Sequence, residues 1–192
     1  MQVAIKSPLK GTTRFSREDK FVKETLEYLE RAVKYSKREN TSAIYDLAIM
    51  HKSLGEMEQS RSCLQLMVNK PEGMLPLDYA KAYEQMGLVL KEMAESEEDQ
   101  REKKRLLQES KSMLMIALKN VSQMFDGCPG IQIGEVWRSF PTLLELVKDS
   151  DLAEDKKLKE KALLFQLIKN HRQSLDLLHE IERMDPDKAN DP

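Results

Sequence analysis

The clearest pattern in the sequence is the match of residues 158–186 to a helix–turn–helix repeat of about 34 residues. Such a repeat favours small residues at positions 8, 20 and 27 and large apolar residues at positions 11 and 24. With Pro186 at position 32, these positions hold, in chain order, Ala162, Phe165, Ser174, Leu178 and Ile181. Only Ile181 is larger than its position favours. A single repeat cannot bury its apolar face, so the stretch predicts an array of stacked helix pairs, which points to binding rather than catalysis.

Residues 41–74 follow the same register, with Thr41 at position 1. Positions 8, 20, 24 and 27 hold Ala48, Ser60, Leu64 and Met67. Gly55 falls at position 15, where the turn between two helices needs a residue that tolerates positive φ. His51 falls at position 11, and we interpret it as a half-buried structural histidine rather than a ligand.

A third unit begins at Ala80 and is interrupted after its first helix, in which Gly87 takes position 8. The register resumes about ten residues late, after the polar stretch 95–104. Positions 20, 24 and 27 of the second helix are then Ser110, Leu114 and Ala117. The inserted stretch contains no glycine or proline and is rich in helix formers. We therefore expect it to lengthen both helices of the unit.

The front of the chain supplies only half a unit. Residues 1–15 are predicted to be a disordered lead-in, and a helix is expected from Ser16 onward, with Asp19 in its first turn. Apolar residues at three- and four-residue spacing within 16–40 predict an amphipathic helix that corresponds to the second helix of a repeat.

The strongest break in the pattern is the glycine- and proline-containing segment 126–130. A helix is expected beyond it, from about Glu135, and Pro141 would then lie past the first turn and kink it. Trp137 is the only tryptophan. We interpret it as packing on the preceding repeat, with anchorage of a partner as the alternative.

Taken together, residues 25–186 resemble tetratricopeptide-repeat (TPR) proteins. The resemblance implies an all-α fold, a short solenoid of about seven or eight helices in antiparallel pairs. It implies one domain over residues 16–186, followed by a tail at 187–192. Its units are about 16–40 (a half-unit), 41–74, 77–122 with its insert, and 135–186. The long inserted helices are also similar in style to the interferon-induced TPR proteins, which bind viral RNA ends and each other.

Composition excludes several functions. Charged residues make up 33% of the chain but the net charge is −2, which disfavours a primary role in binding polyanions. Cys63 and Cys128 are far apart and three histidines lie in separate contexts, so no zinc site is expected. No stretch is long and apolar enough for a membrane span, and no secretory signal precedes the domain. The expected location is the cytoplasm.

The sequence also lacks the common motifs of catalysis and nucleotide binding. There is no glycine-rich phosphate loop and no nucleophile elbow, so we expect no enzyme, no catalytic residue, no cofactor and no metal. TPR proteins that clamp a chaperone's C-terminal carboxylate carry Lys and Asn at positions 5 and 9 of a first helix. Here those positions are Tyr45 and Ile49 in one unit and Glu84 and Leu88 in the next. Chaperone-tail binding is therefore not expected.

The sequence thus predicts a non-catalytic scaffold or adaptor that binds a protein or peptide in a concave groove formed by the first helices. The candidate groove residues are Tyr45, Ile49, Lys52, Lys81, Glu84, Gln85 and Leu88. RNA binding in the manner of the interferon-induced proteins is one alternative. It would use the cations Lys34, Lys37, Arg38, Lys52, Lys81 and Lys91. Self-association through residues 16–40, giving a homo-oligomer, is the other.

Overall fold

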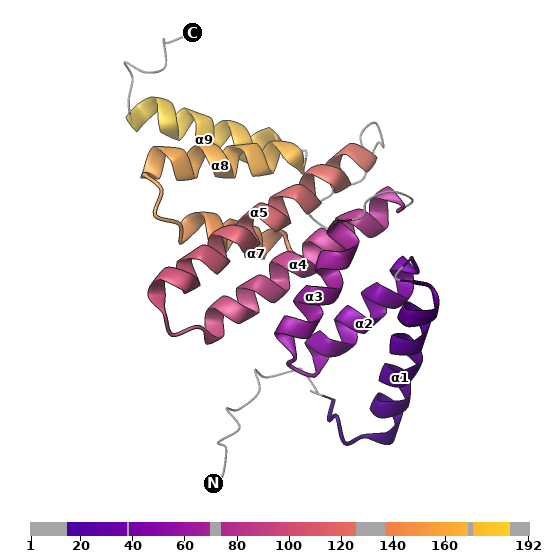
Figure 1. Cartoon of the computed structure of the whole chain (residues 1–192). Coiled ribbons are helices and arrows are strands. Elements are labelled where there is room, and N and C mark those ends of the chain that lie inside the picture. The colour runs from indigo at the N-terminus through magenta and orange to yellow at the C-terminus, as the bar shows by residue number, and fades with distance from the viewer. Residues whose placement is uncertain (1–14, 38, 70–73, 126–136, 169–170, 185–192) are drawn as a thin grey trace. The chain divides into compact units, whose positions relative to one another are not determined.

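A computed structural model of the chain describes residues 15–37, 39–69, 74–125, 137–168 and 171–184. Within these ranges all regular structure is helical, which confirms the all-α prediction (Figure 1). Contacts between residues group the chain into two compact units, residues 1–70 and residues 71–192. Each unit is described separately below. The single domain predicted over residues 16–186 stays a prediction.

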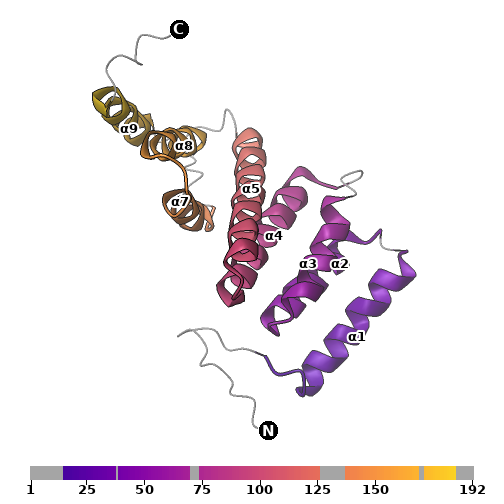
Figure 2. The same ribbon diagram turned by 60° about the vertical axis from the view of Figure 1, so that its left-hand side comes forward.

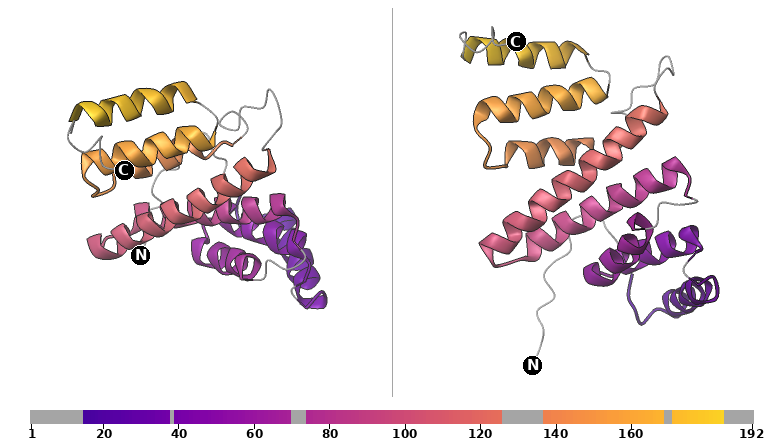
Figure 3. Two further views of the ribbon diagram at one scale, coloured as in Figure 1. Left: turned by 90° about the horizontal axis from the view of Figure 1, so that it is seen from above. Right: turned by 45° about the horizontal axis from the view of Figure 1, so that its top comes forward.

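Among its described residues, the first unit contains three helices: α1 (Lys20–Tyr35), α2 (Thr41–Ser53) and α3 (Met57–Val68). The described part of the second unit contains five: α4 (Pro76–Ser96), α5 (Gln100–Met124), α7 (Phe140–Lys148), α8 (Glu154–Leu167) and α9 (His171–Met184). The most extensive helix contacts join α2 with α3, α4 with α5, and α8 with α9. Figures 2 and 3 show these three pairs as hairpins of adjacent helices.

The α2–α3 hairpin buries the small residues that the register predicts. Ala48 on α2 and Ser60 on α3 are both fully buried. Gly55, in the turn, has a φ of 80°, as expected for its position. The turn is closed by His51, which is buried and whose Nδ1 lies 2.7 Å from a carboxylate oxygen of Glu56. His51 therefore has a structural partner.

Helix α1 covers α2 with one apolar face. Val22 and Leu26 pack with Leu47 of α2 in a core cluster of the first unit. The helix begins four residues later than Ser16, because Asp19 is its N-cap and accepts a hydrogen bond from the backbone nitrogen of Phe21 at 2.8 Å.

The α4–α5 hairpin is longer than an ordinary repeat, because α4 has 21 residues and α5 has 25. The insert at 95–104 therefore extends both helices, as the sequence predicts. The two helices approach closely at Gly87, whose carbonyl oxygen accepts a 2.7 Å hydrogen bond from the buried Ser110 hydroxyl. Leu114 fills the space beside Gly87 where a larger residue would place its side chain. The small residues thus set the contact distance between the helices.

Helix α7 differs from the prediction of a kinked helix from Glu135. It begins at Phe140, so Pro141 lies in its first turn, where a missing backbone N–H costs nothing. Residues 137–139 are not helical, and Glu135 lies outside the described residues. The predicted kink is therefore wrong. Trp137 is buried with Phe140 and Leu143 in the core cluster of the second unit, as the packing interpretation requires.

The α8–α9 hairpin corresponds to the clearest repeat in the sequence. Ala162 and Ser174, its two smallest register positions, are each 2% exposed. Leu164 of α8 joins the core cluster that also contains Leu118 of α5. Pro186 and the predicted tail at 187–192 lie outside the described residues.

Candidate binding surfaces

The groove predicted from the sequence draws on both units. Its first half is on α2, where Tyr45, Ile49 and Lys52 are all partly exposed. These residues occupy one face of the helix because they are spaced by three and four residues. Tyr45, Ile49 and Lys52 thus share one partly exposed face of α2.

The second half of the predicted groove is on α4, and part of it is already in use within the second unit. The Glu84 carboxylate accepts a 2.5 Å hydrogen bond from Ser139. Leu88 packs against the core cluster that contains Trp137 and Phe140. One turn further on, the Lys91 ammonium lies 3.6 Å from a carboxylate oxygen of Glu145 on α7. Ser139 and Glu145 therefore contact this face of α4, and of the predicted residues only Lys81 is exposed rather than partly exposed.

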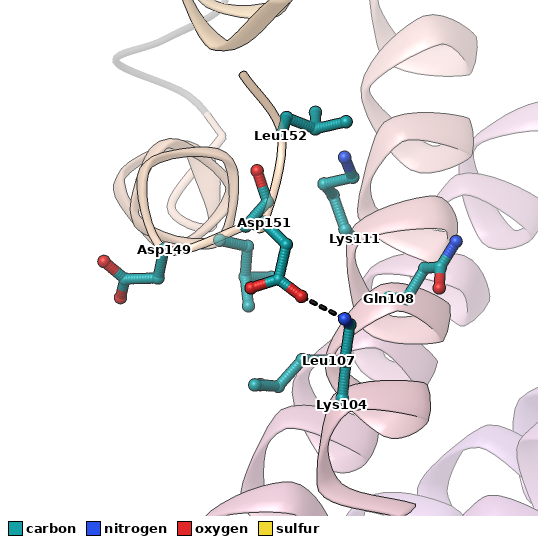
Figure 4. Close-up of a pocket in the computed structure, with 9 residues that line it drawn as sticks. Lys104, Leu107, Gln108, Lys111, Asp149, Asp151 and Leu152 are labelled. Carbon is teal, nitrogen blue, oxygen red and sulfur yellow. Dashed lines mark ion pairs between the residues drawn. The ribbon is translucent and has the colours of Figure 1, made fainter. Parts of the chain in front are cut away.

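A pocket that the sequence did not predict lies between α5 and the turn that joins α7 to α8 (Figure 4). It has a volume of about 260 Å³. Three leucines form its apolar lining: Leu107, Leu146 and Leu152. The rim is polar and includes Lys104, Gln108, Lys111, Asp149, Ser150 and Asp151. We call this site the α5 pocket.

Ion pairs link α5 to the segments on the other side of the α5 pocket. Lys104 of α5 pairs with Asp151 of the opposite turn (Figure 4). The hydrogen bond from Lys104, with its positive charge, holds the pKa of the Asp151 carboxyl below its usual range. Deeper in unit 2, the Lys111 ammonium lies 2.9 Å from a carboxylate oxygen of Glu160 on α8. Because Lys104 and Asp151 are both well exposed, their pair is weak and can open for a ligand.

The arrangement fits an apolar side chain from another molecule. Pockets for whole small ligands usually have about 300–1,000 Å³, so a smaller one suits one or two side chains. The leucine lining supplies apolar contact, and the charged rim supplies hydrogen bonds for a neighbouring peptide backbone or polar group. Sequence reasoning missed the site because its walls are about forty residues apart in the chain. The one available signal was the insert that lengthens α5.

Potential metal ligands do not cluster in the part of the chain that the structure describes. No group of three or more His, Cys, Asp or Glu side chains in it could hold a metal ion. Burial, and to a lesser extent the charge of Glu30, raises the pKa of the Cys63 thiol, which disfavours a reactive thiolate. Cys128 lies outside the described residues.

The cations suggested for RNA binding are partly committed to carboxylates. Lys81 lies 4.0 Å from Asp78, and Lys91 lies 3.3 Å from Glu95 in addition to its contact with α7. Lys34 and Lys37 line a shallow hollow beside α1. Arg38 lies outside the described residues. Of the named cations, Lys34, Lys37 and Lys52 belong to the first unit, and Lys81 and Lys91 belong to the second.

Comparison with known proteins gives a match to a solved structure but none to a family model or a curated sequence. No family model matches the chain, and no curated protein matches its sequence. Among solved structures, the chain is similar to nearly identical TPR-like repeats assigned to a kinesin light chain of Podosopora anserina, with 11% identity and a TM-score of 0.36. That similarity spans 88% of this chain and 90% of the other.

The class of the protein rests on its own helices. Three helix hairpins bury small residues at the register positions of a TPR-like repeat, as Ala48, Gly87 and Ala162 illustrate. The chain is thus an all-helical protein of TPR-like hairpins. Within its described residues, the structure contains no helix both long and apolar enough to cross a membrane.

Proposed function

We propose that the protein is a non-catalytic interaction scaffold that binds a segment of another protein. The observation that supports this most directly is the α5 pocket, a leucine-lined cavity of side-chain size with a charged rim. Apolar anchors that fill such pockets supply much of the affinity of protein interfaces, and a polar rim around them confers orientation. The partner segment would place one apolar side chain against Leu107 and Leu152.

Blocking the α5 pocket tests this proposal. Gln108 is an exposed residue of α5 at the mouth of the pocket, so Gln108→Trp fills the mouth without disturbing the core. Peptides selected from a random library on the immobilised full chain should share an apolar anchor. We expect the Gln108→Trp variant to bind them at least about tenfold more weakly, which is about 1.4 kcal/mol.

The matched control is Gln123→Trp, which makes the same change at an exposed position of the same helix outside the pocket. Its affinities for the selected peptides should stay within about twofold of the wild-type values. Equal weakening by both variants, or no effect of either, would show that the α5 pocket is not the binding site.

A second, separate prediction of the scaffold function concerns the predicted groove residues. The charge reversals Lys52→Glu and Lys81→Glu, combined in one chain, should remove partners that bind through α2 and α4 because both lysines lie at exposed or partly exposed surface. The measurement is the set of proteins that co-purify with the variant. Lys23→Glu combined with Lys119→Glu is the control, since it changes the charge equally at exposed sites on α1 and α5. Partners that survive the groove reversals would show that the groove assignment is wrong.

The same co-purification experiment also tests RNA binding, which we do not propose as a second function. Nuclease treatment of the extract would remove partners that bind through RNA, in the manner of the interferon-induced proteins. A direct titration would then show a steep loss of affinity with added salt, because cation contacts with phosphates release counterions.

A further inference from the structure

Helix α1 exposes a row of three aromatic side chains on the face that does not contact the core. Phe21, Tyr28 and Tyr35 are 77%, 70% and 81% exposed. They are spaced by seven residues, or almost two turns, so they lie nearly one above another along the helix. Val22 and Leu26 meet the core of the first unit from a different face of the same helix. We call the row the aromatic stripe.

Such a stripe is costly to leave in water. Aromatic side chains dominate interface energetics because they combine a large apolar area with few rotatable bonds. Contiguous exposed apolar residues rimmed by charges mark interaction surfaces on soluble proteins. The rim is present here, since Lys20, Glu24, Glu27 and Arg31 follow one flank of the stripe.

We propose that the aromatic stripe is the interface through which two copies of this chain associate, with α1 packed antiparallel on α1. The two-fold axis passes beside Tyr28, which faces the partner's Tyr28. Phe21 then faces the partner's Tyr35, and Tyr35 faces the partner's Phe21. All six rings of the two copies are therefore covered. The interface goes beyond the proposed scaffold function and does not depend on it.

The charged flank favours this arrangement over others. In this register Tyr28 lies opposite the partner's Tyr28. Two residues, one from each copy, therefore lie at the same height along the helix axes when their residue numbers add up to 56. Arg31 therefore lies about one residue, or ~1.5 Å along the axis, from the height of the partner's Glu24 and about two residues from that of the partner's Glu27. In a parallel pair the two-fold axis runs along the helices, so the charged flank of each helix would face the uncharged flank of its partner. Opposite charges thus meet only in the antiparallel pair.

The other flank permits close approach. Thr25 and Ala32 border the stripe there, and they lie at nearly the same height as the partner's Ala32 and the partner's Thr25. Neither residue carries a charge or a long side chain that would separate the helices. Six exposed rings would bury on the order of 1,000 Å², which is the low end for a specific interface and indicates a weak, micromolar dimer.

Sedimentation velocity of the full chain tests the proposal. We expect the wild-type protein to shift from monomer to dimer between about 1 and 100 µM, the range over which a micromolar dimer assembles. Tyr28→Glu places like charges at the centre of the interface and should leave a monomer throughout this range. Because Tyr28 is exposed, far-UV circular dichroism should show unchanged helix content. Leu175→Glu is the control, since Leu175 is an exposed apolar residue of α9 that should not alter association.

A charge exchange tests the register and orientation. Lys20→Glu with Arg31→Glu leaves only acidic residues on the flank, and Glu24→Lys with Glu27→Lys leaves only basic ones, so each double variant alone should dimerise more weakly. A mixture of the two variants should form a heterodimer at least as stable as the wild-type dimer. A wild-type monomer at every concentration, a dimer that tolerates Tyr28→Glu, or no recovery in the mixture would overturn the proposal.

Discussion

Replacement of Gly87 by alanine is expected to lower the free energy of unfolding of the second unit by about 2 kcal/mol, as a core overpacking substitution does. The new Cβ atom would lie 2.6 Å from Cγ of Leu114 and 3.1 Å from the backbone oxygen of Ser110. Leu114 is fully buried and cannot swing into solvent, so the two helices must separate. Separation also weakens the hydrogen bond from Ser110 to the Gly87 carbonyl, worth about 1 kcal/mol. The better helix propensity of alanine offsets only about 1 kcal/mol of this cost.

Urea unfolding followed by fluorescence measures the effect, because Trp137 is the only tryptophan and lies in the core of the second unit. Leu114→Ala supplies the matched comparison and should cost about 3–4 kcal/mol by itself. In the double variant, the Cβ atom at position 87 enters the space that Leu114 leaves. The combined cost should therefore be clearly smaller than the sum. Strict additivity of the two single effects would contradict the close packing described for Gly87.

Removal of the Trp137 side chain is expected to have the larger effect, with a loss of about 3–5 kcal/mol for Trp137→Ala. Trp137 is 4% exposed and packs with Phe140, whose ring centre lies 6.5 Å away. Its loss leaves a cavity between α5, α7 and α8, which the short α7 cannot fill by shifting. Because the variant lacks tryptophan, far-UV circular dichroism must report its unfolding.

Trp137→Phe separates packing from hydrogen bonding. The indole nitrogen of Trp137 is buried and has no hydrogen-bond partner among the described residues. Phenylalanine removes that unpaired donor, so its cost should be limited to the lost volume, about 1–2 kcal/mol. A loss as large as that of Trp137→Ala would mean that the nitrogen has a structurally important partner. Stability unchanged in both variants would place Trp137 outside the core.

The repeat register could be predicted from the sequence because it is a local property. Ala48, Gly87 and Ala162 each sit where one helix must approach the next, and the spacing of small residues along a helix directly records that approach. The longer helices α4 and α5 were predictable for a similar reason, since the insert at 95–104 contains only residues that continue a helix.

The sequence is least informative where backbone capping and distant contacts decide the outcome. The kink expected at Pro141 is wrong because the helix starts at Phe140, and no residue near 135 signals that delay strongly. The assignment of Glu84 and Leu88 to a groove stays a prediction, and the tertiary structure adds a hydrogen bond to Glu84 from Ser139, 55 residues further along the chain. No periodicity in α4 encodes that partner.

The sequence by itself determined the fold class, the helix pairing and the small-residue contacts, because helix periodicity and residue size act over distances of one or two turns. Only the tertiary structure decided which faces remain exposed. The α5 pocket requires Leu107 and Leu152 to meet across two elements. The spacing of the aromatic stripe is visible in the sequence, but only the packing of α1 on α2 shows that Tyr28 points to solvent. Exposure depends on all neighbours at once, and those are set by the packing of distant segments.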